Sequence, residues 1–248
     1  MRYLIISDIH SNLEALEAVL RASASRKCDG VIVLGDLVGY GADPNAVVDR
    51  IRGLKPIATV RGNHDKVAAG LETAEDFNPM AKAAAAWTQT ALSDPTLDYL
   101  KKMPVGPLLV NELLEICHGS PLDEDLYVVG DLDATRSIAA SRRQLCLFGH
   151  THVALRASVD GKKTLEIETP QGNPEFETTL HSGAKYLINP GSVGQPRDGD
   201  SRAAYAIADL DEQVVTLYRV AYPIEIAQGK ILEAGLPPML AYRLGMGR

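Results

Sequence analysis

The chain begins with a strand pattern that runs directly into polar residues, Tyr3-Leu4-Ile5-Ile6-Ser7-Asp8-Ile9-His10. Consecutive apolar and aromatic residues are typical of a buried strand. Short β-branched runs of this kind alternate with amphipathic stretches through the first two thirds of the chain. This alternation predicts strand–helix–strand units and a largely parallel sheet, with polar residues at the carboxyl ends of its strands.

Helix signals separate the predicted strands. Ser11 and Glu14 match a capping box, so we expect the first helix to begin directly after His10. Asp43-Pro44 predicts the start of a second helix, which we expect to stop at Gly53. After the strand at 3–6, the expected strands are 31–34, 56–60, 113–117, 145–148, 186–188, 203–207 and 214–220.

Residues 66–102 are alanine-rich and helical in pattern, which we interpret as a helical insertion or cap. From His152 onward alternation dominates, and Asp160-Gly161 is a strong hairpin turn, so the second half is expected to be β-rich and partly antiparallel. Because there is no internal repeat and no obvious linker, we expect a single domain over 1–248, with the insertion at about 66–102.

The composition limits the class of protein. With 46% hydrophobic and 23% charged residues, disorder is not expected, and no apolar stretch approaches the ~20 residues of a membrane span. A net charge of −7 argues against stable nucleic-acid binding. Three cysteines without CxxC spacing and the lack of an export signal favour the cytoplasm, and Cys117 and Cys146 are expected in the core. The oligomeric state is not indicated.

Five of the six histidines fall in short polar clusters beside predicted strands. Residues two apart on an extended backbone project to the same side, so each Asp-x-His or His-x-His pair can converge on a metal. Imidazole with carboxylate suits Mn, Fe, Ni, Co or Zn, and the lack of a thiolate pair argues against structural zinc. The clusters are Asp8-Ile9-His10, Gly35-Asp36, Gly62-Asn63-His64-Asp65, His118-Gly119 and Gly149-His150-Thr151-His152.

Seven potential ligands are too many for one ion with open positions. They suit two ions that share a bridging carboxylate, the arrangement used for in-line attack at phosphorus. The ordered series DxH, GDxV, RGNHD, H and GHTH resembles the calcineurin-like metallophosphoesterases, and most closely their small prokaryotic, phosphodiesterase-like members.

This resemblance implies an α/β fold, a four-layer α/β/β/α sandwich of two mixed sheets. It also implies two divalent ions, with manganese favoured, and a metal-bridging hydroxide as the nucleophile in a phosphoester hydrolase. One metal would be held by Asp8, His10 and His152, the other by Asn63, His118 and His150, with Asp36 bridging.

The resemblance further assigns roles to the residues around Asn63. His64 would act on the leaving group, Asp65 would orient His64, and Arg61 would contact the phosphate.

The sequence departs from part of the family after the GDxV element. Protein Ser/Thr phosphatases carry Arg-Gly there, whereas this chain has Gly39-Tyr40-Gly41, so one phosphate-binding arginine is missing. This favours a phosphodiesterase acting on a small or nucleotide-like substrate. The alternatives are a phosphomonoesterase or protein Ser/Thr phosphatase, and a dinucleoside polyphosphate hydrolase. A non-catalytic metal-binding scaffold is disfavoured, because every ligand position and His64 are intact.

Two features of the second half are left open. The segment 189–197 resembles one that is common in the small prokaryotic members, with no role that the sequence reveals. Arg197 could reach the phosphate or be exposed, and we weigh these evenly. His181 lies outside every cluster and is expected in a solvated loop.

Overall fold

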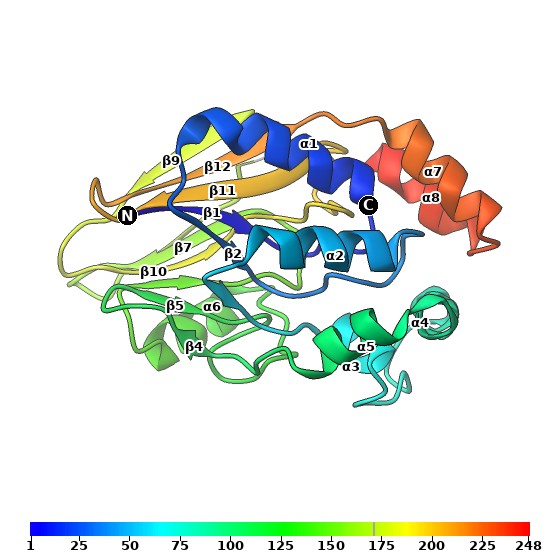
Figure 1. Ribbon diagram of the computed structural model, residues 1–248. Helices are drawn as coiled ribbons and strands as arrows, with labels where there is room; N and C mark the ends of the chain where they lie inside the picture. Colours follow the sequence, from blue (N-terminus) through cyan, green and yellow to red (C-terminus); the bar gives the residue numbers. More distant parts are fainter. Residues whose placement is uncertain (171) are drawn as a thin grey trace.

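Two mixed sheets of six strands each face one another in the computed structural model, which describes residues 1–170 and 172–248 (Figure 1). Sheet 1 has the order β3-β2-β1-β11-β12-β9, and sheet 2 has the order β4-β5-β6-β10-β7-β8. The strands of sheet 1 are β1 (Arg2–Ile6), β2 (Gly30–Val33), β3 (Ala58–Thr59), β9 (Glu175–Thr179), β11 (Ala203–Asp209) and β12 (Val214–Val220). Those of sheet 2 are β4 (Leu108–Leu109), β5 (Leu114–Ile116), β6 (Leu145–Leu147), β7 (Leu155–Val159), β8 (Leu165–Glu168) and β10 (Lys185–Asn189).

Each sheet contains a parallel half that carries the polar clusters. In sheet 1, β1, β2 and β3 are parallel and β11 pairs with β1 antiparallel. In sheet 2, β5, β6 and β10 are parallel, and β7 and β8 continue antiparallel. The carboxyl ends of six parallel strands therefore meet at one end of the sandwich.

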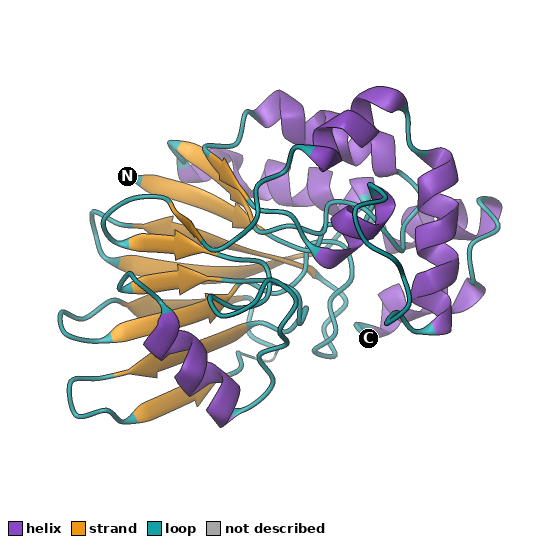
Figure 2. Ribbon diagram, turned by 90° about the horizontal axis from the view of Figure 1, so that it is seen from below, coloured by secondary structure: helices purple, strands orange, loops and turns teal. Residues whose placement is uncertain are grey.

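The helices lie outside the sheets and complete four layers (Figures 1 and 2). Helices α1 and α2 cover sheet 1, and α6 covers sheet 2 on the far side. Three buried apolar clusters fill the three spaces between these layers. The helices are α1 (Leu13–Ser23), α2 (Pro44–Leu54), α3 (Asn63–Ala68), α4 (Pro79–Ala91), α5 (Asp94–Lys101), α6 (Asp131–Ala140), α7 (Ile224–Glu233) and α8 (Pro238–Met246). The predicted α/β/β/α sandwich is confirmed.

The predicted strands and the first two predicted helices are present, but most of them begin or end at residues other than those predicted. Helix α1 begins after Asn12, whose side chain accepts the Ala15 N–H bond, so Asn12 and not Ser11 is its N-cap. The strand pair around Asp160-Gly161 is an antiparallel hairpin, as predicted. Sequence patterns missed α6, α7 and α8. No helix among the described residues is both long and apolar enough to cross a membrane.

Candidate metal centre

The predicted ligands lie in the loops that follow the parallel strands. Asp8 and His10 follow β1, Asp36 follows β2, and Asn63 is the first residue of α3 after β3. His118 follows β5, and His150 and His152 follow β6. All seven come to one end of the sandwich, from both sheets.

The ligand loops are not extended, which corrects the argument made from the sequence. Positive φ values are found at Asp8 (52°), His10 (48°), Asp36 (52°), His150 (67°) and His152 (61°). Residues with a side chain rarely adopt this left-handed region, and they persist there only when surrounding contacts hold them. The paired ligands therefore converge through sharp loop turns rather than through strand alternation.

One group of potential ligands contains Asp8, His10, Asp36 and His152, all buried. The Nε2 atoms of His10 and His152 are 3.0 Å apart, and His152 Nε2 lies 3.3 Å from Asp8 Oδ1. Two imidazole nitrogens this close, with carboxylate oxygens beside them, form a set of donors that converges on one point.

A second group contains Asp36, His118 and His150. His118 Nε2 lies 3.1 Å from His150 Nδ1. Asn63 adds a further candidate, because its Oδ1 atom is buried without a hydrogen-bond partner in the part of the chain that the structure describes. A buried amide oxygen with no partner is costly unless something binds it, and a divalent cation fits that need.

Asp36 belongs to both groups through one oxygen. Its Oδ2 atom lies 3.5 Å from His10 Nε2 and 3.4 Å from His118 Nε2, while Oδ1 accepts the backbone N–H bond of His64 at 2.9 Å. The two groups are also joined by the backbone N–H of His150, which donates to Asp8 Oδ2 at 3.1 Å. The residues present therefore fit two adjacent cations with Asp36 between them.

Backbone carbonyls fix which nitrogen each histidine turns inward. The Nδ1 atoms of His10, His118 and His152 donate to the carbonyls of Val38, Leu34 and Gln195 at 3.0, 2.7 and 2.6 Å. Each of these rings thus keeps Nε2 as its electron-pair donor. His150 is reversed, because its Nε2 donates to the Asp125 carbonyl at 3.0 Å and leaves Nδ1 for the centre.

Burial and neighbouring charges shift the pKa values of the ligand side chains in opposite directions. Burial raises the pKa of Asp8 to about 7. Burial opposes the charged form of His118, yet the neighbouring Asp36 carboxylate raises the His118 pKa to about 10. Burial likewise opposes ionised Asp36, but the His118 imidazole holds the Asp36 pKa well below its usual range. Positive charge is therefore favoured next to Asp36, where a divalent ion would supply it.

His64 is placed beside the centre and outside both ligand groups. Its ring packs in a tilted orientation against Tyr40, at 4.4 Å between centroids, and against Phe77, at 4.5 Å. Gly39, with φ +93°, makes room for it, since a Cβ there would lie 2.6 Å from His64 Nδ1. Burial lowers the pKa of His64 to about 4.

Asp65 does not orient His64, which corrects the prediction. Its carboxylate accepts backbone N–H bonds from Leu37 (2.9 Å), Val38 (3.2 Å) and Gly62 (3.0 Å). Consecutive residues at the start of α3 point in different directions around the helix, so the two side chains diverge. Asp65 instead holds the Asp36 loop against the start of α3.

Arg61 is engaged by an acidic partner. Its Nε and Nη2 atoms donate to the two carboxylate oxygens of Glu124 at 3.0 and 2.8 Å. Lys66 also binds Glu124, together with Asp125 and Glu72. The charge of Arg61 is therefore largely balanced within the protein.

The loop after β10 is a structural part of the centre whose role the sequence left open. Its Ser192 Oγ donates to the Asp8 carbonyl at 2.7 Å, and its Gly194 N–H donates to the same carbonyl at 2.9 Å. Asn189 Nδ2 donates to the Gly149 carbonyl at 2.6 Å. The segment 189–197 thus ties the Asp8 loop of sheet 1 to the His150 loop of sheet 2.

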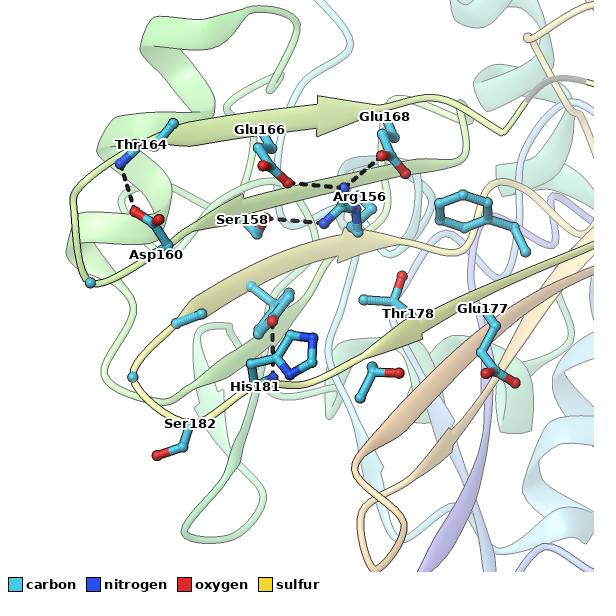
Figure 3. A pocket seen from close by; sticks show the side chains of 16 residues that line it. Arg156, Ser158, Asp160, Thr164, Glu166, Glu168, Glu177, Thr178, His181 and Ser182 are labelled. Atoms are coloured by element: carbon cyan, nitrogen blue, oxygen red, sulfur yellow. Dashed lines mark hydrogen bonds and ion pairs between the residues drawn. The ribbon is translucent and has the colours of Figure 1, made fainter.

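Two cavities differ in their relation to this centre. One of about 180 Å³ is lined by Asn63 and His150 together with Phe77, Tyr127 and acidic residues. A wider groove of about 550 Å³ lies between β8 and β9, and none of the predicted ligands lines it (Figure 3). Arg156 in that groove is paired with Glu166 and Glu168.

Comparison with known proteins agrees with this geometry. Residues 1–213 match the model of the calcineurin-like phosphoesterase superfamily domain, and the chain belongs to this family of metal-dependent phosphoester hydrolases. It is 36% identical over 249 residues to the uncharacterized protein MJ0912 of Methanocaldococcus jannaschii, covering 98% of this chain and 97% of that protein.

Solved structures extend the likeness along the whole chain. A metallophosphoesterase from Sphaerobacter thermophilus, known from a crystal structure, is 41% identical in sequence, with a TM-score of 0.88. The match covers 100% of this chain and 99% of the Sphaerobacter chain. The hypothetical protein PH1004 from Pyrococcus horikoshii OT3 is 19% identical, with a TM-score of 0.77. The match covers 100% of this chain and 98% of the PH1004 chain. At 19% identity, the similarity to PH1004 shows a shared fold alone.

Proposed function

We propose that the protein is a two-metal phosphodiesterase acting on a small or nucleotide-like substrate, with manganese as the favoured ion. The observation that carries this proposal is the single oxygen of Asp36 that belongs to both ligand groups. Two bound divalent ions would polarise the phosphoryl oxygens and lower the pKa of a water for in-line attack. Asp8, His10 and His152 would hold one ion, and Asn63, His118 and His150 the other.

His64 is proposed to act on the leaving group. Its ring lies 5.0 Å from the His10 ring, and its Nδ1 is buried without a partner in the described residues. The aromatic rings of Tyr40 and Phe77 hold the imidazole in place. With a pKa of about 4 the imidazole is neutral near pH 7, so it would assist departure of an alkoxide by donating a hydrogen bond from its ring N–H, while leaving the ligand set intact.

The cavity beside His150 supports a diester over a monoester. Tyr127 packs in a tilted orientation against His150 at 3.7 Å between ring centroids, and Phe77 lines the same cavity. Glu72, Asp76 and Asp125 also line it, which disfavours a second anionic group there. An uncharged alcohol portion of a diester suits these walls, because apolar faces bind it and no unpaired cation is needed.

The test measures diester and monoester turnover with the same nitrophenolate leaving group, on protein loaded separately with Mn, Fe, Ni, Co or Zn. We expect faster diester hydrolysis, highest with Mn, and loss of activity in Asp36→Asn. Asp49→Asn is the matched control, because Asp49 is an exposed carboxylate on α2 paired only with Arg52 among its described neighbours. A strong monoester preference would favour a phosphomonoesterase instead.

A further inference from the structure

Arg197 is a cation without an acidic partner near the metal centre. Among the described residues it forms no ion pair, and its Nη2 donates to the neutral Gln195 Oε1 at 3.0 Å. Its Nε atom is buried with no hydrogen-bond partner among the same residues. The acidic residues that follow it are neutralised elsewhere, since Asp198 pairs with Arg219 and Asp200 pairs with Arg202.

Arg197 lies on the His10 and His152 side of the metal centre. Its backbone N–H donates to the His152 carbonyl at 3.2 Å. Its guanidinium carbon lies 5.6 Å from the centroid of the Tyr40 ring, and that ring lies 4.7 Å from the ring of His10. Its charge also contributes to lowering the pKa of His152, after the larger effect of burial.

Arg243 on α8 adds a second positive charge in the same region. The end of α8 is fixed to the Arg197 loop, because the Gly199 N–H donates to the Gly247 carbonyl at 2.9 Å. Arg243 is partly buried, its Nε donates to the backbone oxygen of Arg248 at the end of the chain, and it forms no ion pair with an Asp or Glu side chain among the described residues. Burial lowers its pKa, and the nearby charge of Arg197 lowers it further.

Two partly buried guanidinium groups in one region repel each other, and an anion that binds both relieves that repulsion. We infer that Arg197 and Arg243 form an anion-binding subsite on the His10 and His152 side of the metal centre, which binds a second anionic group of the substrate. A phosphate or carboxylate has the required chemistry, because guanidinium groups bind both through charge-assisted hydrogen bonds.

This inference rests on the proposed function and predicts how the two ends of the substrate are oriented across the metal centre. The acidic cavity is lined by Asn63 and His150 of one ligand group, whereas Arg197 is bonded through its backbone to His152 of the other group. The uncharged part of a diester would face Phe77 and Tyr127, and its second anionic group would face Arg197. The expected substrate class is therefore a phosphodiester that carries an additional phosphate or carboxylate. Arg197 lies within residues 1–213 that match the family model, whereas Arg243 lies beyond them, so the C-terminal helices supply one half of this subsite.

The test compares equilibrium binding of two probes to the Mn-loaded protein by calorimetry. Propylphosphonate and 3-phosphonopropionate share the phosphonate and differ in a terminal methyl or carboxylate. We expect wild-type protein to bind 3-phosphonopropionate about ten-fold more tightly or better, the gain of one charge-assisted hydrogen bond. Arg197→Gln and Arg243→Gln should each reduce that preference, and the double variant should abolish it.

Arg202→Gln is the matched control, since Arg202 lies near the same loop and is already paired with Asp200. It should keep the preference, and Arg197→Lys should keep part of it. Metal content and circular dichroism identify any variant that is misfolded.

The outcomes separate the two proposals. Equal binding of the probes by wild-type protein, or a preference that survives in the double variant, would overturn the subsite while leaving the diesterase proposal intact. Arginine-dependent binding of 3-phosphonopropionate with no binding of propylphosphonate would support the subsite and contradict the phosphoesterase proposal. Failure of both probes to bind would contradict both.

Discussion

Gly194→Ala is expected to damage the metal centre without touching a ligand. A Cβ at position 194 would lie 1.8 Å from the carbonyl oxygen of Ile9, between the ligands Asp8 and His10. A carbon and a carbonyl oxygen approach no closer than about 3.3 Å, so one segment must move by roughly 1.5 Å. Gly194 has no positive φ, so the effect is one of space and not of backbone conformation.

The size of the effect follows from the contacts that such a movement breaks. The Gly194 N–H donates to the Asp8 carbonyl at 2.9 Å, and Asn12 Nδ2 donates to the Gly194 carbonyl at 2.9 Å. Each lost hydrogen bond costs about 1 kcal/mol, or more where a buried group is left unpaired. Overpacking adds about 1 to 3 kcal/mol, so we expect the free energy of unfolding to fall by about 3 to 5 kcal/mol.

Urea denaturation of the metal-free protein measures the loss of stability, and elemental analysis of the folded protein measures metal content. Gly229→Ala is the matched control, because a Cβ there meets nothing within 4 Å and the residue lies inside α7. It should stabilise the protein by about 0.5 to 1 kcal/mol. If Gly194→Ala unfolds within about 0.5 kcal/mol of wild type and keeps both metals, the packing argument is refuted.

Three further substitutions test other parts of the centre. Asp36→Asn should lower metal content by removing the shared negative charge, whereas Asp8→Asn should empty mainly one site; full occupancy in Asp36→Asn, measured by elemental analysis, would contradict the bridge. His64→Ala should keep its metals and lose ~100- to 10,000-fold in rate for poor leaving groups but much less for nitrophenolate; equal losses across a leaving-group series would exclude that role. Asn189→Ala should lower the free energy of unfolding by about 1 to 3 kcal/mol, because the Asn189 side chain loses its buried hydrogen bonds with Gly149, Thr151 and Gly191; a denaturation curve that matches wild type would count against it.

The sequence predicted the layers and the clustering because both depend on local patterns. The apolar run before Asp8 and the polar residues after each parallel strand place the ligands at one edge, whatever the exact loop conformation. The left-handed backbone at Asp8 and His150 could not be predicted, because only a few per cent of residues other than glycine adopt it, even though Asp and His do so more often than most. It is imposed by contacts from distant segments, such as the Ser192 hydroxyl on the Asp8 carbonyl.

The same dependence on distant segments explains why the contacts of Arg61 and Asp65 could not be predicted from the sequence. Glu124 lies far from Arg61 in the chain and has no motif of its own, so its ion pair appears only in three dimensions. Asp65 was grouped with His64 by adjacency, but its partners are backbone groups of the Asp36 loop. Arg197 and Arg243 are brought into one region because the end of α8 is bonded to the loop that carries Arg197, which no periodicity records.

The ligands are divided between the two sheets, with those from Asp8 to Asn63 on one and the three histidines from His118 onward on the other. A loaded centre would therefore act as a clamp across the sandwich, because pulling the sheets apart would break bonds to the ions. Metal loading should raise thermal stability, since ions that bind only the folded protein shift the unfolding equilibrium. It should also slow amide hydrogen exchange in β1 and β6 together, although these strands belong to different sheets.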